Sequence, residues 1–379
     1  MKKKLFLLIL ALTLLLPGCG QPYVYQVPEE LDDGWETASL EEVGIKERLI
    51  AKAVERIGDN TYPNVHSLLI VKDGKLVFEE YFGGYEWVYE SDRFQGPYKE
   101  FDRDSLHTIM SVTKAFTSAL VGIAVDQRFI ANEHEKVFDY FPEYAHLRDE
   151  RKNDITLEHL LTMTSGLEWN EWEYSLSDTQ NDLIQLFIVN DPIAYILAKP
   201  VVHQPGTYWY YSGGDVNLLG EIIRKATDMR MDDFAAQYLF SPLGITEYEW
   251  DFINPDVVHA SGNLELRPRD MAKFGYLILN DGVWQGERIL SQAWADKTKT
   301  AYISSPAPDH GERYGYQWWL KTFPYGSGTV EALHRSGWGG QAIYLLPSWD
   351  MMIVFTGGNY VGEIPNNEII TRYILPAVR

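Results

Sequence analysis

Strand patterns occur near both ends of this 379-residue chain, and a mainly helical stretch separates them. Near the amino end, residues 66–71 and 76–82 flank a Lys-Asp-Gly-Lys turn and predict a β-hairpin. Two strand-rich ends that enclose a helical middle favour one sheet built from both ends. We therefore expect an α+β fold: an antiparallel sheet flanked by helices, with an all-α subdomain inserted at about residues 129–255. The strands predicted near the carboxyl end are 314–320, 331–336, 342–346 and 351–356.

The predicted helices follow apolar residues that recur at the helical period. Residues 111–127 carry apolar side chains over most of the helix circumference, so we expect this helix to be buried. Another helix is expected at residues 39–58, where Ser39 and Glu42 suit a capping box. The other predicted helices are 156–162, 192–198, 215–227, 231–239, 269–280 and 363–375.

The amino-terminal residues are typical of an export signal. Three lysines precede an apolar run at residues 5–16 that is too short to span a bilayer comfortably. The Leu-Pro-Gly-Cys sequence that ends at Cys19 resembles a bacterial lipobox, which implies cleavage before Cys19 and its acylation. We expect a signal peptide at 1–18, a tether at 19–38 and a domain at 39–379, in an exported, membrane-anchored envelope lipoprotein. The alternative is an ordinary secretory signal with a chance cysteine.

Composition limits the partners and cofactors of the chain. Cys19 is the only cysteine, so no internal disulfide can form and the core alone must hold the fold. A formal net charge of −21 argues against nucleic-acid binding and favours solubility. The sequence has no zinc motif, P-loop or dinucleotide fingerprint, and we expect no cofactor and assign no metal ligand.

A Ser-x-x-Lys tetrapeptide, from Ser111 to Lys114, opens the buried helix. Residues three apart lie on one face of a helix, so the lysine can reach the serine hydroxyl. A desolvated lysine has a lowered pKa and can act as a base near neutral pH. Such a tetrapeptide arises by composition about once in a chain of this length, so a serine cap with a solvent-facing lysine is an equal alternative from this motif alone.

Two glycine-rich segments supply further candidates. Tyr211 lies in a tight segment, residues 206–215, just before a predicted helix, where it can point into a cleft and relay a proton. Residues 334–341 predict a strand followed by glycines, whose backbone N–H groups can bind an oxyanion. A packed tyrosine and a plain turn are the alternatives.

In this order and spacing, the three sites resemble the serine β-lactamase and penicillin-binding family, in its class C-like and esterase-like branch. Further similar stretches run from about residue 40 to the end, among them 71–77, 155–167, 205–207, 241–245 and 266–275. Tyr-Ser-Gly-Gly-Asp at 211–215 and Gly-Trp-Gly-Gly-Gln at 337–341 look most like 6-aminohexanoate-dimer hydrolases and related carboxylesterases. The resemblance implies the β-lactamase/transpeptidase-like fold.

The resemblance also implies roles for individual residues. Ser111 would be the acylated nucleophile, Lys114 its base, and Tyr211 the proton shuttle to the leaving group. The N–H groups of Ser111 and Trp338, beside Gly337, would form the oxyanion hole.

This chain departs from the family pattern at two motifs. Gly213 stands where the second motif often has an asparagine, and Arg335 stands where the third often has a lysine, with His334 as an alternative by a one-residue shift. Arg335 can pair with a substrate carboxylate or be a solvated surface residue.

Four functions follow from these observations. The first is hydrolysis of small esters or amides, and the second is a peptidoglycan-directed D-Ala-D-Ala carboxypeptidase or transpeptidase. A non-catalytic binding relative is the third. A true β-lactamase ranks last because of Gly213 and Arg335. The absence of Gly-x-Ser-x-Gly argues against an α/β-hydrolase, and the sequence leaves the oligomeric state open.

Overall fold

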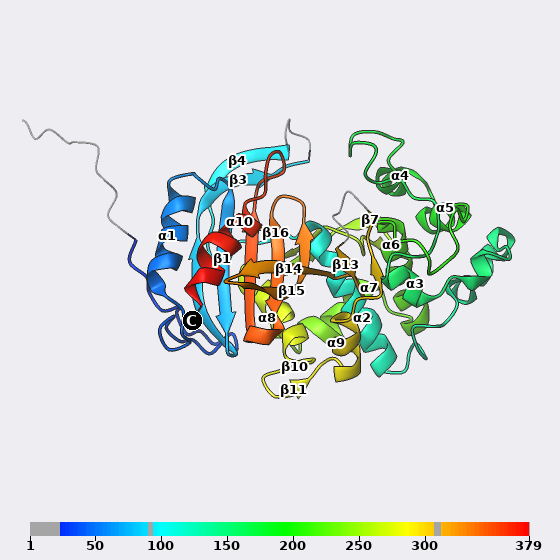
Figure 1. Cartoon of the computed structure of the whole chain (residues 1–379). Coiled ribbons are helices and arrows are strands. Elements are labelled where there is room, and N and C mark those ends of the chain that lie inside the picture. Colours follow the sequence, from blue (N-terminus) through cyan, green and yellow to red (C-terminus); the bar gives the residue numbers. More distant parts are fainter. Residues whose placement is uncertain (1–22, 90–93, 307–311, 379) are drawn as a thin grey trace, which may run out of the picture.

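An eight-stranded antiparallel sheet forms the centre of the molecule (Figure 1). The computed structural model describes residues 23–89, 94–306 and 312–378. The strands lie in the order β12-β13-β14-β15-β16-β17-β1-β2. Their bounds are β1 Val65–Lys72, β2 Lys75–Tyr81, β12 Ile303–Ser304, β13 Arg313–Tyr314, β14 Trp319–Tyr325, β15 Gly328–Gly337, β16 Gln341–Leu346 and β17 Met351–Gly357. Strands β1 and β17 come from opposite ends of the chain and pair directly, which confirms the sheet predicted from both ends.

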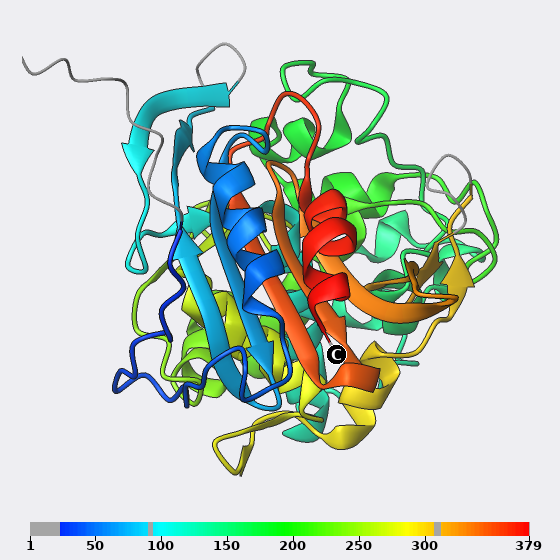
Figure 2. The same ribbon diagram turned by 60° about the vertical axis from the view of Figure 1, so that its left-hand side comes forward.

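The two faces of the sheet bury separate apolar clusters. On β1, Leu69 and Val71 join one cluster, whereas Leu68 and Ile70 join the other. Successive side chains of a strand point to opposite faces, so a run of continuous apolar residues is expected where both faces are covered. Helix α1 (Glu47–Gly58) and the carboxyl-terminal helical segment, which begins with α10 (Asn366–Ile369), lie side by side over one face (Figure 2).

Helix α8 (Pro268–Leu279) covers the opposite face, and a larger helical region containing α2 (Thr113–Asp126) extends beyond it. In Figure 1 most of this region lies on the side of the sheet away from α1. Its other helices are α3 Leu157–Leu161, α4 Asp182–Ile188, α5 Pro192–Ala198, α6 Gly213–Thr227 and α7 Met231–Ala235, with α9 Gln292–Thr298 near the sheet. Helix α4 has no counterpart among the predicted helices.

Short elements complete the chain. The short strands are β3 Gly83–Trp87, β4 Gln95–Glu100, β5 His107–Thr108, β6 Tyr248–Trp250, β7 Phe252–Asn254, β8 Val257–Val258, β9 Leu264–Leu266, β10 Val283–Trp284 and β11 Glu287–Arg288. The short 3₁₀ and π turns are η2 Met110–Val112, η3 Val137–Tyr140, η4 Pro142–Leu147, η5 Lys152–Asp154, η6 Ala236–Phe240, η7 Pro347–Trp349, η8 Ile370–Ile374 and η9 Leu375–Ala377. No helix among the described residues has the length and apolar character needed to cross a bilayer.

Two predicted elements differ from the structure. Ser39 and Glu42 exchange the hydrogen bonds of a capping box, but Gly44 at φ +73° ends that turn and the helix begins only at Glu47. The predicted strand 314–320 is two strands, β13 and β14, because Gln317 takes a φ of +66° between them.

The expected tether also differs over its described part, which begins at Tyr23. Tyr25 donates a hydrogen bond to the Val77 carbonyl, and Trp35 is buried against Tyr276 and Trp284. These contacts bury large aromatic rings, so from Tyr23 onward this segment belongs to the folded domain. The expected signal peptide and Cys19 lie outside the described residues.

Candidate active site

Ser111 lies in the 3₁₀ turn η2, which leads directly into the buried helix α2. Met110, just before it, has a φ of +49°, a left-handed conformation that is strained for a residue with a side chain. Such strain often occurs at active sites, where it fixes the direction of a side chain. Ser111 keeps partial solvent exposure, although the next thirteen residues of the chain are buried. The serine is thus presented at the end of an otherwise enclosed helix.

Lys114 is buried beneath Ser111. Its Nζ lies 3.2 Å from Ser111 Oγ and 2.6 Å from the carbonyl oxygen of Ser261. The side chain is only 1% exposed, and no described carboxylate forms an ion pair with it. The structure therefore contradicts the alternative of a solvent-facing lysine.

Tyr211 completes a three-residue contact. Its Oη lies 2.8 Å from Ser111 Oγ, and Lys114 Nζ sits 4.8 Å from the centre of its ring. The tyrosine stands just before α6, where the Ser212 hydroxyl caps the helix by accepting a hydrogen bond from the Asp215 N–H at 3.0 Å. The local chain direction is thereby fixed, and the serine, lysine and tyrosine predicted from two separate sequence segments meet at one point.

Arg335 reaches the same point from strand β15. Its Nε donates to the Ser111 carbonyl at 2.7 Å, Nη1 to Tyr314 Oη at 3.1 Å and Nη2 to Tyr211 Oη at 3.1 Å. The side chain is 0% exposed. The structure contradicts the alternative of a solvated surface arginine. Pairing with a substrate carboxylate stays a prediction, and three of the five guanidinium N–H groups already donate to protein acceptors.

Strand β15 passes very close to the nucleophile turn. A Cβ at Gly337 would lie 2.4 Å from the Ile109 carbonyl oxygen and 3.1 Å from the Ser111 nitrogen, so only glycine fits. Trp338 follows directly, partly exposed, and its indole Nε1 donates to the Tyr360 carbonyl at 2.9 Å. Its ring packs edge-on against Phe94 at 4.8 Å. The use of the Ser111 and Trp338 N–H groups as an oxyanion hole stays a prediction.

Glu171 is a site residue that the sequence analysis missed. Its Oε2 accepts hydrogen bonds from the Gly213 N–H at 2.7 Å and from Trp169 Nε1 at 2.9 Å. A Cβ at Gly213 would lie 2.7 Å from the same oxygen. The carboxylate therefore fills the space of the side chain that position 213 lacks. The neighbouring Trp172 is 71% exposed and stands edge-on to the Tyr211 ring at 5.3 Å.

A cluster of neutral polar side chains lies behind Lys114. Ser261, whose carbonyl accepts from Lys114, is linked through its hydroxyl to Asn217 Nδ2 at 3.1 Å and to His259 Nε2 at 3.0 Å. Burial, and then the nearby Lys114 charge, lower the pKa of His259 to about 3. The histidine is therefore neutral, and no pattern in the sequence pointed to it.

Asp215 is a second buried group that the sequence analysis missed. Oδ1 accepts a hydrogen bond from Ser165 Oγ at 2.8 Å, and Oδ2 has no partner among the described residues. Burial raises the pKa of this carboxyl to about 7, although hydrogen bonds from Ser165 and Ser212 oppose the increase. The carboxyl joins the loop around Ser165 to the start of α6, near Tyr211.

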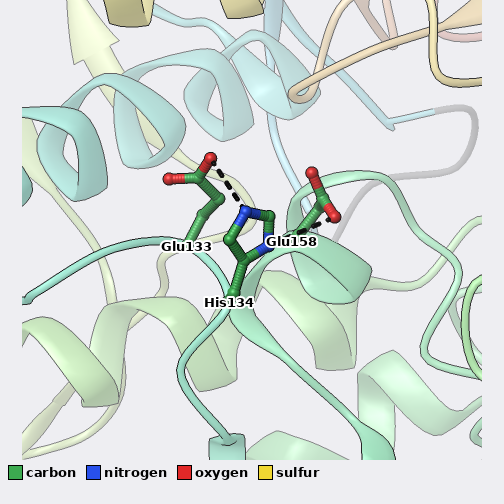
Figure 3. Close-up of side chains that lie close together, drawn as sticks. All are labelled: Glu133, His134 and Glu158. Carbon is green, nitrogen blue, oxygen red and sulfur yellow. Dashed lines mark ion pairs between the residues drawn. The ribbon is translucent and has the colours of Figure 1, made fainter.

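Three potential metal ligands also gather away from Ser111, at Glu133, His134 and Glu158 (Figure 3). The two carboxylates lie on either side of the imidazole, each 3.6 Å from one ring nitrogen. Glu133 already pairs with the ammonium group of Lys297, and Glu158 accepts a hydrogen bond from Tyr316. We interpret this group as an ion-pair cluster that reaches from the buried Glu133 to the exposed His134, and in which Lys297 already supplies the positive charge.

Comparison with known proteins identifies the family of the chain. The beta-lactamase family model matches residues 48–361. The 6-aminohexanoate-dimer hydrolase of Paenarthrobacter ureafaciens is 24% identical over 276 residues, which cover 67% of this chain and 66% of that protein. Protein flp of Staphylococcus aureus strain COL is 28% identical over 203 residues, which cover 53% and 38%. The chain thus spans less than two thirds of the length of these curated relatives.

Solved structures share the fold. A family VIII carboxylesterase superimposes with a TM-score of 0.66 at 19% identity and covers 88% of this chain and 99% of that one. The octameric penicillin-binding protein homologue from Pyrococcus abyssi has a TM-score of 0.64 at 19% identity, with 88% and 77% covered. At these identities the likeness shows the fold, which confirms the predicted β-lactamase/transpeptidase-like architecture.

Proposed function

The chain belongs to the beta-lactamase family, and from this we propose that it is a serine hydrolase that cleaves small esters or amides through an acyl-enzyme on Ser111. One observation carries the proposal. Ser111 Oγ lies within hydrogen-bond distance of both Lys114 Nζ and Tyr211 Oη, at 3.2 and 2.8 Å. A nucleophile within reach of two proton-transfer groups is the arrangement that acyl transfer needs.

Acylation would proceed in two steps, each coupled to a proton transfer. Neutral Lys114 takes the Ser111 proton while Oγ attacks the substrate carbonyl carbon, and the backbone N–H groups of Ser111 and Trp338 stabilise the oxyanion. When the tetrahedral intermediate collapses, the bond to the leaving group breaks and the Tyr211 hydroxyl protonates that group. Lys114 returns a proton to Tyr211. Water then repeats the sequence on the acyl-enzyme and releases the acid.

Arg335 and, once it has taken the Ser111 proton, Lys114 are two buried cations that support this chemistry. Lys114 lies over the Tyr211 ring and Arg335 donates to its hydroxyl oxygen. Both charges stabilise the negative charge that Tyr211 Oη carries after it gives up its proton. Lys114, Tyr211 and Arg335 are all buried, so each interaction is stronger than it would be in solution.

The burial of Arg335 also indicates which classes of substrate the site favours. Penicillins and D-Ala-D-Ala peptides carry a carboxylate, whereas Arg335 has no solvent exposure and donates three of its five N–H groups to protein acceptors. This favours hydrolysis of uncharged esters and amides over β-lactamase activity. A peptidoglycan-directed carboxypeptidase is the second candidate, because the fold is also that of a penicillin-binding protein homologue. A non-catalytic relative fits less well, since the serine, lysine and tyrosine are in contact.

A panel of substrates tests the proposed function. Purified protein and Ser111→Ala would be compared on p-nitrophenyl butyrate, a linear amide dimer, a D-Ala-D-Ala peptide and nitrocefin. We expect turnover of the ester or amide that Ser111→Ala abolishes. Preferred turnover of the peptide would move the function to the second candidate, and rapid nitrocefin hydrolysis would contradict the ranking.

We also propose that the protein is an exported lipoprotein anchored through Cys19. Cys19 is the only cysteine, so metabolic labelling with palmitate in an expressing bacterium reports on this residue alone. Labelled protein in the membrane fraction, and unlabelled protein after Cys19→Ala, are the expected results. Unlabelled wild-type protein released from the membrane would contradict the anchor.

A further inference from the structure

The helical region contains a cavity that none of Ser111, Lys114, Tyr211 and Arg335 lines. Its volume is about 220 Å³, and its walls come from two segments of the chain, within residues 166–173 and 202–210. The first segment connects α3 to α4, and the second connects α5 to α6. The proposed hydrolase reaction gives this cavity no role.

Backbone hydrogen bonds hold the two walls in place. The Val202 N–H donates to the Gly166 carbonyl at 2.8 Å, which joins one wall to the other. The Tyr210 N–H donates to the Met163 carbonyl at 2.9 Å, so the second wall is fixed near both of its ends. The cavity is therefore part of the fold and does not depend on how side chains happen to be arranged.

Three aromatic side chains line the cavity. Trp169 is only 4% exposed, and its indole Nε1 donates to Glu171 at 2.9 Å. Tyr208 is 37% exposed and stacks on His203, with ring centres 4.0 Å apart, and Tyr210 is half-buried. The face of an aromatic ring carries negative potential, so it attracts a positively charged group that lies within about 6 Å. These walls favour a cation that also has apolar surface.

Two carboxylates also line the cavity, those of Glu168 and Glu173, and both residues are exposed. Asn170 fixes the position of Glu173: its Nδ2 donates to Glu173 Oε2 at 3.4 Å, and its Oδ1 accepts from the Glu173 N–H at 3.3 Å. Neither carboxylate forms an ion pair within the part of the chain that the structure describes. Their negative charge is therefore available to a ligand.

Two cations of the same region already have other partners. Arg151 Nη1 donates to a backbone carbonyl at 2.6 Å, and Lys199 pairs with Asp182. Neither of them lines the cavity. Burial first, and then acidic neighbours led by Glu173, raise the pKa of the Tyr210 hydroxyl in the cavity wall. The potential at this wall is negative, as a site for a cation requires.

We propose that this cavity binds a small organic ammonium ion, with its alkyl groups against the aromatic rings and its charge balanced by Glu168 and Glu173. The ligand is small because the cavity is below the roughly 300–1,000 Å³ that is usual for drug-sized ligands. The rings attract the charge through cation–π interactions, and the two carboxylates add a direct electrostatic attraction. The inference goes beyond the proposed hydrolysis at Ser111 and does not depend on it.

Choline and 3,3-dimethylbutan-1-ol test the role of the positive charge. The two molecules have nearly the same shape, but the alcohol has a neutral carbon in place of the quaternary nitrogen. Their affinities for the purified protein are measured by ligand-observed NMR titration at constant salt. We expect choline to bind at least roughly tenfold more tightly, because the cation–π and carboxylate interactions act only on the charged ligand. Ser111→Ala should give the same ratio, so the outcome is separate from that of the hydrolase assay.

Three variants locate the bound choline. Tyr208→Leu removes one ring and should weaken choline binding roughly fivefold, whereas Tyr208→Phe keeps the ring and should bind choline as the wild type does. Glu173→Gln removes a charge but keeps an acceptor for Asn170, and it should also weaken binding roughly fivefold. Glu287→Gln is the control, because Glu287 is exposed on β11 and does not line the cavity.

Equal affinities for choline and the neutral alcohol, or no binding of choline to the wild type, would overturn the proposal. Unchanged choline affinity in both Tyr208→Leu and Glu173→Gln would place any binding elsewhere and would overturn it as well. If Tyr208→Leu fails to fold by circular dichroism, the comparison of Glu173→Gln with Glu287→Gln decides the question.

Discussion

Arg335 donates a hydrogen bond from Nη2 to the hydroxyl oxygen of Tyr211 at 3.1 Å, from a position with no solvent exposure. The same guanidinium holds the Ser111 carbonyl through Nε. One side chain therefore joins the nucleophile turn to the proton-transfer tyrosine, across 124 residues of sequence from Tyr211.

Replacing Arg335 tests whether this link matters for turnover. Arg335→Met removes the charge-assisted hydrogen bond to Tyr211, an interaction worth about 1.5–3 kcal/mol, so kcat/KM for p-nitrophenyl butyrate should fall roughly 10- to 150-fold. Arg313→Met, an exposed arginine on β13, is the control and should leave the rate unchanged. Near-normal kinetics for a folded Arg335→Met protein would show that the contact has no role in catalysis.

Lys114→Ala and Tyr211→Phe test the assigned proton transfers. Each should slow acylation by at least roughly a hundredfold, the usual scale for loss of a general base or acid. Pre-steady-state release of p-nitrophenol measures this step directly. An acylation rate close to that of the wild type in Lys114→Ala would contradict the role of that lysine.

Gly213→Asn tests whether Glu171 occupies the space of the missing side chain. The new Cβ would meet Glu171 Oε2 at 2.7 Å, so we expect overpacking to cost about 1–3 kcal/mol of stability. Adding Glu171→Ala should restore much of the loss, and a double-mutant cycle measured by urea unfolding gives the coupling. Gly58→Asn is the control, because a Cβ there meets nothing within 4 Å. Additive effects of the two changes would contradict the contact.

The raised pKa of the Asp215 carboxyl predicts that the stability of the protein depends on pH. Its folded pKa of about 7 lies above the unfolded value of about 3.9, so the folded state binds more protons between these values. The contribution of this carboxyl to stability is therefore greatest at low pH and is lost as the pH rises from about 4 to 7. Asp215→Asn removes the titration. The free energy of unfolding of this variant should therefore increase relative to that of the wild type as the pH rises from 4 to 8. Parallel curves for the two proteins would refute the shift.

Local patterns predicted the elements whose structure depends on neighbours in the sequence. The hairpin at 66–82 and the buried helix at 111–127 both occur, since strand alternation and helical period are short-range signals. The strand predicted at 314–320 failed because the left-handed turn at Gln317 depends on its buried hydrogen bonds to the Leu160 and Leu161 carbonyls, far away in sequence.

The residues of the site also fall into two classes, those that a local motif identifies and those that only the tertiary fold brings to the site. The family-like motifs identified Ser111, Lys114 and Tyr211 because each motif is continuous in sequence. The position of Arg335 underneath the nucleophile depends on how β15 packs against η2, which no local pattern encodes. Glu171 comes from the segment between α3 and α4, and only the tertiary fold reveals that it borders Gly213.

The central claim is that Ser111 is the nucleophile, and covalent labelling tests it most directly. Wild-type protein and Ser111→Ala would be treated with a fluorophosphonate, and intact mass and peptide mapping would locate the adduct. The account predicts one adduct on the peptide that contains Ser111, and none in Ser111→Ala. An adduct on another residue, or an unlabelled wild type, would contradict it.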